Sequence, residues 1–286
     1  MSPPLPVASR LGVCSWSLRP TSPDDLARKL TATGLRYVQL DLEPLRKGAW
    51  DESVVRDRLQ GSRVAVLSGM MSMLGEDYSS LDSIRATGGL RPDTTWEANR
   101  LAADECAVLA ERMGLDLVSF HAGFLPHGTD DPERVTLLDR LRTVIDIFED
   151  RGVHVALETG QESADTLLAV LEELDRPTVG VNFDPANMIL YGMGDPVLAL
   201  DRLSVWVRQI HIKDAQRATQ PGQWGSEVPV GTGEVDWSAF FGLVRARDMN
   251  VDLVIEREAG EERVADVCTA RDLVTRTVGG HLVGPS

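Results

Sequence analysis

The sequence has few cysteines, and none of them is placed for a cross-link. The three cysteines lie far apart in a chain of 286 residues, and none has C-x-x-C spacing. This pattern excludes a disulfide framework and a cysteine-based metal or redox motif. The sequence also lacks an apolar run near the roughly 18 residues that a membrane span requires. Its first ten residues have neither the basic nor the apolar region of a secretory signal. We therefore expect free thiols and a cytoplasmic protein without membrane contact. The cysteines are Cys14, Cys106 and Cys268.

Basic residues are in the minority. The chain has 29 Lys and Arg against 44 Asp and Glu, a formal net charge of −15, and no dense Lys/Arg run. This balance is poorly suited to the phosphate backbone of a nucleic acid or to an anionic membrane surface. A content of 43% hydrophobic and 26% charged residues is typical of a globular protein with a substantial core. The composition therefore favours a small-molecule partner that is neutral or held by a metal ion.

Short β-branched segments alternate with longer amphipathic ones along the whole chain. A helix is predicted over 94–114, with Gly114 at its C-terminal end, and a last helix over 262–278. Eight strands that alternate with helices in about 280 residues predict a single α/β domain over 1–286, a closed (β/α)8 TIM barrel. An open doubly wound sheet is the alternative, but the segment "CSWSLRP" after the first strand is not a Gly-rich phosphate turn. The predicted strands are 11–17, 37–42, 64–70, 117–123, 154–159, 179–184, 207–214 and 251–258.

Four consecutive predicted strands end in groups that can bind a metal. Because parallel strands deliver their C-terminal ends to one rim of a barrel, these side chains are expected to converge. Three crowded carboxylates repel one another, and a divalent cation offsets that repulsion. The set of three carboxylates and one imidazole favours Mn, Mg or Co, and Zn is also acceptable. The predicted ligands are Glu158 in "HVALET", Asp184 in "VGVNFD", His211 in "VRQIHIKD" and Glu256 in "VDLVIERE".

These segments resemble the sugar phosphate isomerase/epimerase family, whose members have a xylose isomerase-like TIM barrel. The segments "ALETG", "VNFDPAN", "QIHIKD", "PVGTGEVDW" and "LVIERE" occur in the family's order, and "GVCSWSL" and "SFHAGF" match more loosely. The resemblance implies that Glu158, Asp184, His211 and Glu256 bind one divalent cation and that the two glutamates exchange protons with a sugar. In related epimerases a His follows the aspartate by three places, whereas this chain has Asn187.

A cation at this rim can polarise a sugar carbonyl and acidify the proton on the neighbouring carbon. Glu158 and Glu256 are the catalytic candidates, since they lie three strands apart and can approach a sugar from different faces. Removal of a proton by one and its return by the other gives epimerisation, and transfer between adjacent carbons gives isomerisation. The leading prediction is a divalent-metal-dependent isomerase or epimerase acting on a ketose, aldose or keto-sugar. The alternative is a lyase or dehydratase that performs β-elimination on a 3-keto sugar, keto-glycoside or keto-cyclitol.

Seven further residues are candidates for substrate binding. The loop 220–237 is long and Gly-rich, and it is predicted to act as a lid. Lys213 has the side-chain parity of His211 along its strand and is expected to point inward. The alternatives to substrate contact are packing for the tryptophans and a solvated loop charge for Arg217. The seven candidates are Trp16, His121, Asn187, Lys213, Arg217, Trp224 and Glu227.

Two other functions are weighed against these. An endonuclease of the same barrel superfamily needs a His-rich multi-metal site and a basic face, which five His and a net charge of −15 do not provide. A noncatalytic sugar-binding barrel stays open, and it predicts that Glu158→Gln keeps its sugar affinity with no activity to lose. The sequence leaves the monomer and a homo-oligomer equally open.

Overall fold

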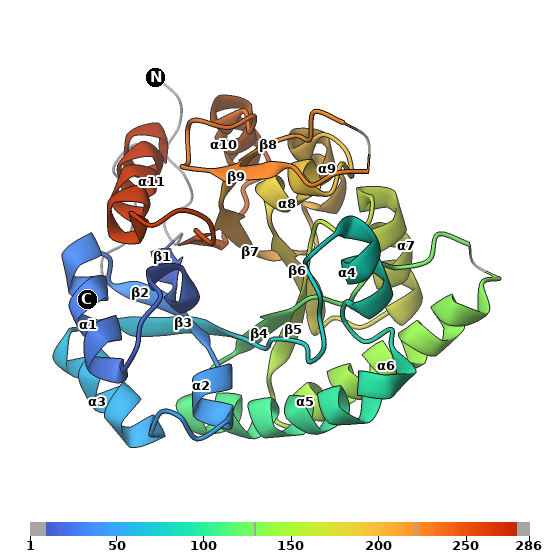
Figure 1. Cartoon of the computed structure of the whole chain (residues 1–286), viewed down its shortest axis with the longest axis horizontal. Coiled ribbons are helices and arrows are strands. Elements are labelled where there is room, and N and C mark those ends of the chain that lie inside the picture. Colours follow the sequence, from blue (N-terminus) through green and yellow to red (C-terminus); the bar gives the residue numbers. More distant parts are fainter. Residues whose placement is uncertain (1–9, 129, 221, 279–286) are drawn as a thin grey trace.

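Eight parallel strands close into a barrel surrounded by helices (Figure 1). The computed structural model describes residues 10–128, 130–220 and 222–278. Of the first ten residues, from which the cytoplasmic location is predicted, nine lie outside the described residues. The neighbours around the barrel run β1-β2-β3-β4-β5-β6-β7-β10 and back to β1. This arrangement confirms the predicted (β/α)8 barrel. Its strands are β1 (Leu11–Cys14), β2 (Tyr37–Asp41), β3 (Ala65–Met70), β4 (Leu117–Phe120), β5 (His154–Glu158), β6 (Val179–Phe183), β7 (Val207–Ile212) and β10 (Asp252–Ile255).

The helices begin and end at residues suited to those positions. In α1 the Ser22 side chain accepts a hydrogen bond from the backbone N–H of Asp25, and Gly34 ends the helix at φ 70°. The predicted helix over 94–114 is α5, which ends as predicted before Gly114 at φ 70°. The helices are α1 (Pro23–Thr33), α2 (Glu43–Arg46), α3 (Glu52–Gly61), α4 (Leu81–Thr87), α5 (Asp93–Met113), α6 (Pro132–Glu149), α7 (Ala164–Leu174), α8 (Pro185–Leu190), α9 (Pro196–Leu203), α10 (Trp237–Ala246), α11 (Arg263–Val278) and the short 3-10 helix η1 (Ser15–Leu18).

The connection after β7 differs from the prediction of a loop without structure of its own. The chain leaves the barrel at Lys213 and forms a two-stranded antiparallel sheet from β8 (Asp214–Gln216) and β9 (Ser226–Val228). Asp214 fixes the base of this hairpin, since its carboxylate accepts the backbone N–H groups of Gly231, Gly233 and Val235 and the Nε1–H of Trp237. Five backbone and side-chain donors therefore converge on one buried carboxylate when the N–H of Ala215 is included.

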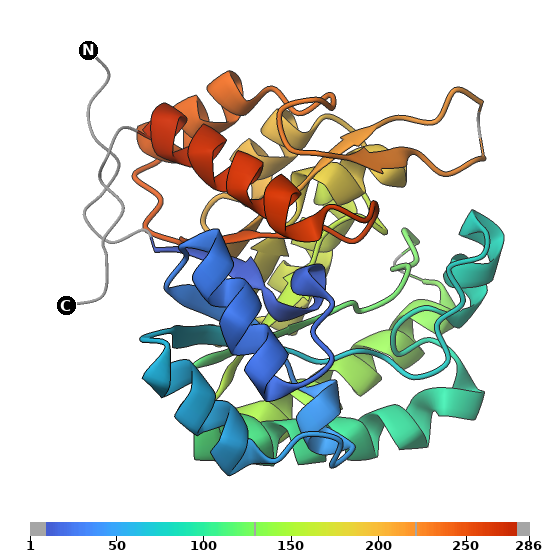
Figure 2. The ribbon, with the colours of Figure 1, turned by 60° about the vertical axis from the view of Figure 1, so that its left-hand side comes forward.

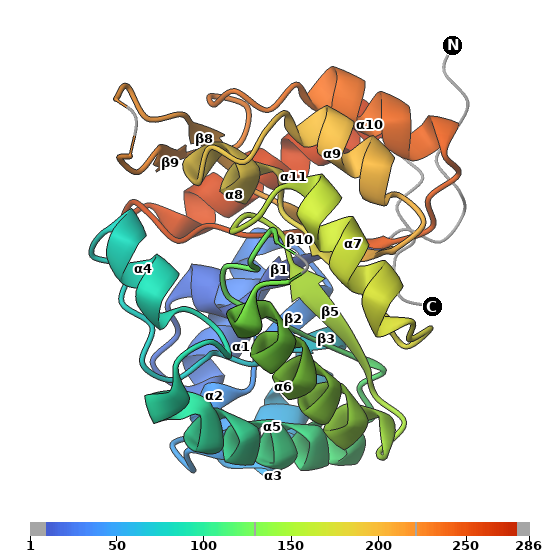
Figure 3. The ribbon, with the colours of Figure 1, turned by 90° about the vertical axis from the view of Figure 1, so that its right-hand side faces the viewer.

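The hairpin and α4 stand on the same side of the barrel (Figure 2). Both follow the C-terminal ends of barrel strands, β7 and β3 respectively, so this side is the rim at which the strands end. Figure 3 shows α5, α6 and α7 along the outside of the barrel. The apolar side chains between strands and helices form one large core, and a small separate apolar cluster at the rim contains Ile84, Phe124 and Tyr191 with Trp224 packed on it.

The cysteines of the described chain are all free, as predicted. Cys14 and Cys106 are buried, whereas Cys268 is partly exposed. Among the described helices, none combines the length and the apolar character that a bilayer crossing demands.

Candidate metal centre

Four side chains with oxygen or nitrogen ligands meet at the C-terminal rim of the barrel. Glu158 is the last residue of β5, and His211 lies on β7. Asp184 and Glu256 directly follow β6 and β10. One ligand atom of each side chain lies within 4.8 Å of the others, and all four residues are at most 4% exposed. The structure thus brings together the four residues that the sequence predicts as ligands.

Polar atoms at the centre of this cluster lack the partners that buried groups normally have. Within the described chain, Asp184 Oδ2 and His211 Nδ1 are buried without a hydrogen bond. Glu256 Oε2 also has no hydrogen bond, and it forms an ion pair with Lys213 Nζ at 2.9 Å. His211 Nδ1 is 3.3 Å from Glu256 Oε2 and 3.9 Å from Asp184 Oδ2. Since unpaired buried polar atoms are costly, this arrangement fits a divalent cation that contacts all three.

The position of Asp184 follows from the start of the next helix. Its Oδ1 caps α8 by accepting the backbone N–H groups of Ala186 and Asn187. Pro185 occupies the first position of the helix, where no N–H is required. Capping therefore uses one carboxylate oxygen and leaves Oδ2 directed at the other ligands.

Burial and neighbouring charges perturb the pKa values of these groups in opposite directions. Burial raises the pKa of Asp184 well above its ordinary value. Burial also opposes ionisation of Glu256, but Lys213 and His211 lower the pKa of its carboxyl well below the usual range. For Glu158 the two neighbouring histidines outweigh burial and lower the pKa. Burial disfavours the charge on Lys213, yet the surrounding carboxylates raise its pKa well above normal. Burial and the neighbouring charges therefore favour the ionised form of Glu158 and Glu256 and the protonated form of Asp184.

Four of the predicted substrate-binding residues lie beside this cluster. Asn187 Nδ2 donates to Glu158 Oε1 at 3.0 Å, and His121 Nε2 lies 3.7 Å from the same oxygen. Trp16 Nε1 donates to Glu256 Oε1 at 2.8 Å. Lys213, as noted, contacts Glu256 from the other side. The two glutamates are therefore held in place by separate sets of neighbours.

Two predicted substrate-binding residues of the hairpin, Arg217 and Trp224, contact residues other than the four candidate ligands. Arg217 is exposed and pairs with Glu234, so the structure directs its guanidinium toward another loop residue. Trp224 packs edge-on against Tyr191 with ring centroids 4.9 Å apart, and its Nε1 is buried without a hydrogen bond in the described chain. The sequence marks both residues as candidates but gives no information on where the hairpin carries them.

Glu227 fastens the hairpin to the end of β10. Its carboxylate lies 2.7 Å from Arg257 Nη1 and accepts the backbone N–H groups of Glu258 and Ala259. The structure therefore places Glu227 in a structural contact beside the site, where its partners are Arg257, Glu258 and Ala259.

Sequence reasoning missed three residues beside the site. Asn182 Nδ2 lies 3.3 Å from Glu158 Oε2, and Gln161 Nε2 lies 3.5 Å from the hydroxyl of Tyr191. Asn182 is a polar residue inside the apolar segment "VGVNFD", two places before the aspartate. Side chains two places apart on a strand point to the same side, so this spacing could have placed Asn182 beside the site. Gln161 and Tyr191 lie in loops, where no periodicity indicates the direction of a side chain.

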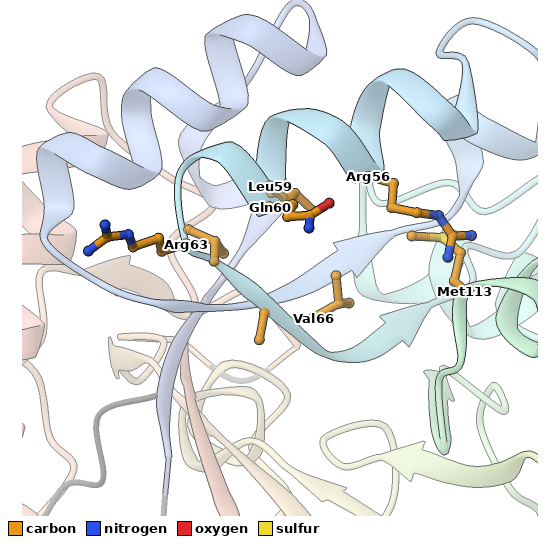
Figure 4. A pocket seen from close by; sticks show the side chains of 8 residues that line it. Arg56, Leu59, Gln60, Arg63, Val66 and Met113 are labelled. Carbon is orange, nitrogen blue, oxygen red and sulfur yellow. The ribbon is translucent and has the colours of Figure 1, made fainter. Parts of the chain in front are cut away.

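Two pockets of the described chain have linings that do not include the four candidate ligands. The pocket in Figure 4 has a volume of about 660 Å³ and lies between α3 and the beginning of β3, at the opposite rim from the strand ends. Barrel chemistry takes place at the C-terminal rim, so this pocket is not the site. A second pocket of about 790 Å³ lies at the C-terminal rim between α8 and the hairpin. Its lining includes Leu81, Tyr191, Arg217, Gln220 and Gln223.

Known proteins match both the fold and the sequence. A family model described as the xylose isomerase-like TIM barrel matches residues 24–273. The 3-oxo-isoapionate decarboxylase of Pectobacterium atrosepticum is 29% identical over 153 residues, 52% of this chain and 55% of that protein. The L-ribulose 3-epimerase of a Methylomonas species is 25% identical over 252 residues, 82% of this chain and 79% of that protein. The chain therefore spans little more than half the length of the decarboxylase.

A solved structure agrees along almost the whole chain. The xylose isomerase domain protein from Planctomyces limnophilus superposes with a TM-score of 0.82 at 29% identity. The match covers 97% of this chain and 98% of that one.

Proposed function

The chain belongs to the xylose isomerase-like TIM barrel family, and on that basis we propose that it is a divalent-metal-dependent enzyme that isomerises or epimerises a sugar. The observation that carries the proposal is the convergence of three carboxylates and one imidazole, with buried ligand atoms that lack hydrogen-bond partners. The reaction it supports is removal of a proton from the carbon next to a carbonyl.

One cation fits this site. Glu158, Asp184, His211 and Glu256 would hold it, and their oxygen-rich set suits Mn, Mg or Co better than Zn. When bound, the cation polarises the sugar carbonyl and offsets the negative charge that develops on its oxygen.

Glu158 and Glu256 are the groups that move the proton. Both pKa values are lowered, so both carboxylates are ionised near neutral pH and able to accept a proton. Asn187 fixes Glu158 and Trp16 fixes Glu256 through the hydrogen bonds described above, which holds each carboxylate in one orientation. Transfer to one glutamate and return from the other inverts a carbon centre, whereas transfer by one group between adjacent carbons interconverts an aldose and a ketose.

The surroundings of the cluster favour a neutral, polyhydroxylated substrate. Besides the ligand atoms, three buried side-chain atoms of the described rim lack hydrogen-bond partners: His121 Nδ1, Gln161 Oε1 and Trp224 Nε1. They include an acceptor and a donor, which complement the hydroxyl groups of a sugar. The cations beside the cluster are already paired, since Lys213 lies 2.5 Å from Glu258 Oε2 and Arg257 pairs with Glu227. Lys213 and Arg257 are therefore not available to a phosphate without the loss of these ion pairs.

A lyase is the second candidate. It is favoured by the match to the decarboxylase, whose identity is higher than that of the epimerase although its alignment is shorter. The same proton removal leads to elimination when a leaving group lies β to the carbonyl of a 3-keto sugar, keto-glycoside or keto-cyclitol. The products separate the two reactions, because isomers conserve mass and elimination releases water or an aglycone.

The test combines metal analysis with isotope exchange. The protein stripped of metal and reloaded with Mn²⁺ is incubated with D-allulose and L-ribulose in deuterated water, and deuterium is located by NMR. We expect label at a carbon next to the carbonyl with wild type, and none with Asp184→Ala or His211→Ala, which lose the cation while circular dichroism shows an intact fold. A wild-type protein that binds no divalent cation rules out the proposal. Cation and sugar binding without exchange would point to a binding protein.

A further inference from the structure

A layer of polar side chains fills the barrel interior beside the metal centre. Its members come from six strands and are at most 1% exposed. Several bonds cross the interior between strands that are not neighbours, such as that from Ser68 Oγ on β3 to Gln209 Oε1 on β7 at 2.6 Å. Such a buried network is stable only when its donors and acceptors are matched. The layer consists of Cys14, Gln39, Ser68, Ser119, Asn182 and Gln209.

The orientation of the Gln39 amide is fixed by its neighbours. Its Nε2 lies 3.4 Å from the backbone carbonyl of Gly69, which can only accept. The same nitrogen donates to Ser119 Oγ at 2.7 Å, and that hydroxyl in turn donates to the sulfur of Met70. Gln39 Oε1 therefore faces the other way, toward His211 Nε2 at 2.7 Å. The thiol of Cys14 lies 3.5 Å from this oxygen and supplies a second donor to it.

The contact determines which imidazole nitrogen carries a proton. An amide oxygen only accepts, so His211 Nε2 must hold a hydrogen at this distance. In the neutral imidazole, the form that binds a cation, the lone pair is then on Nδ1, the atom that lies 3.5 Å from Glu158 Oε1 and 3.3 Å from Glu256 Oε2. We infer that Gln39 is a positioning residue that keeps the proton of His211 on Nε2 and so offers Nδ1 to the cation. This inference rests on the proposed metal site and adds to it the residue that prepares its nitrogen ligand.

Cys14 Sγ also lies 3.6 Å from His211 Nε2, farther away than Gln39 Oε1, and Asn182 offers a closer competing contact. Its Nδ2 lies 3.0 Å from His211 Nε2, and a donor there would favour the opposite tautomer. The same nitrogen lies 3.3 Å from Glu158 Oε2, a carboxylate oxygen that accepts. One of the two amide hydrogens of Asn182 is directed to Glu158, and the 2.7 Å contact of His211 Nε2 with Gln39 Oε1, shorter than its 3.0 Å contact with Asn182, sets the tautomer.

Three variants test the inference. Gln39→Met keeps the length of the side chain and removes the acceptor, whereas Gln39→Glu keeps an acceptor in the same place. Ser68→Ala is the matched control, because it breaks a bond of the same layer that does not involve His211. Mn²⁺ affinity is measured from free Mn²⁺ by electron paramagnetic resonance. We expect Gln39→Met to bind Mn²⁺ about 10- to 100-fold more weakly, the range found for groups that orient metal ligands. Gln39→Glu and Ser68→Ala should stay close to wild type.

Nitrogen NMR reports which ring nitrogen of His211 carries the proton, a property that would not depend on Gln39 if this residue only supported the fold. In wild type saturated with Mg²⁺, His211 should show a proton on Nε2 and none on Nδ1, and this spectrum decides the question even if Gln39→Met does not fold. Unchanged Mn²⁺ affinity in Gln39→Met, an equal loss in Ser68→Ala, or an unprotonated Nε2 in wild type would each overturn the inference. A wild type that binds neither ion removes the proposed function itself, and the inference with it.

Discussion

Glu162 is a buried carboxylate without a charged partner, and replacing it tests whether burial alone perturbs its ionisation. The residue precedes Ser163, the capping residue of α7, and is 4% exposed. Burial is the only cause that raises the pKa of Glu162, from 4.5 to about 8. We expect Glu162→Gln, which keeps the shape and removes the ionisable group, to stabilise the protein at alkaline pH.

The size and sign of this effect follow from proton linkage. Between pH 4.5 and about 8 the unfolded chain has released the proton of Glu162, while the native state still holds it. The native state then binds more protons, so the free energy of unfolding falls as pH rises through this window. At about 1.4 kcal/mol for each pKa unit, the loss reaches about 5 kcal/mol above pH 8. Below pH 4.5 both states are protonated, and the loss disappears.

Urea unfolding followed by circular dichroism measures the difference between variant and wild type. Near pH 5 the two should differ little, and near pH 9 Glu162→Gln should be more stable by several kcal/mol. The control is Glu172→Gln, at an exposed position on α7, which should show no such trend. A difference that is constant with pH, or a variant that is less stable near pH 9, would refute the account of burial.

Three further substitutions have defined outcomes. Lys213→Met should raise the pKa of Glu256, because it removes the ammonium group 2.9 Å away, and so move the acid limb of the kcat/KM profile to higher pH. Asn187→Ala removes the donor to Glu158 Oε1, and steady-state kinetics should show kcat lowered by about 10- to 100-fold for a charged hydrogen bond. Asp214→Asn replaces an acceptor of several hydrogen bonds by a group that also donates, and urea unfolding should show a loss of about 2 to 4 kcal/mol.

The barrel and the convergence of the four candidate ligands could be predicted because their signal is periodic. Each barrel strand is an apolar run, and its terminal polar residue must reach the common rim whatever the details of packing. The positions of Glu158 and Asp184 at the rim can be predicted on these grounds alone. The same reasoning applies to His211 and Glu256, which lie at the ends of the last two barrel strands.

Contacts that depend on long-range geometry could not be predicted in this way. Glu227 contacts Arg257 because a hairpin turns back toward β10, and no local pattern encodes that path. Gln39 looks like an interruption of the apolar segment "YVQLDL", and its role depends on a partner 172 positions away. The sequence shows that a polar side chain is buried there, but only the closed barrel identifies what it faces.

The polar layer has a consequence for how the protein matures in the cell. Because its members come from six strands, the imidazole is correctly presented only after the ring of strands has closed. A chain with one strand out of register would lack part of this support and hold the ion weakly. If the proposed cation binds at this site, its uptake would stabilise finished molecules and not partly built ones. Metal supply during expression should therefore influence the yield of folded protein as well as its activity.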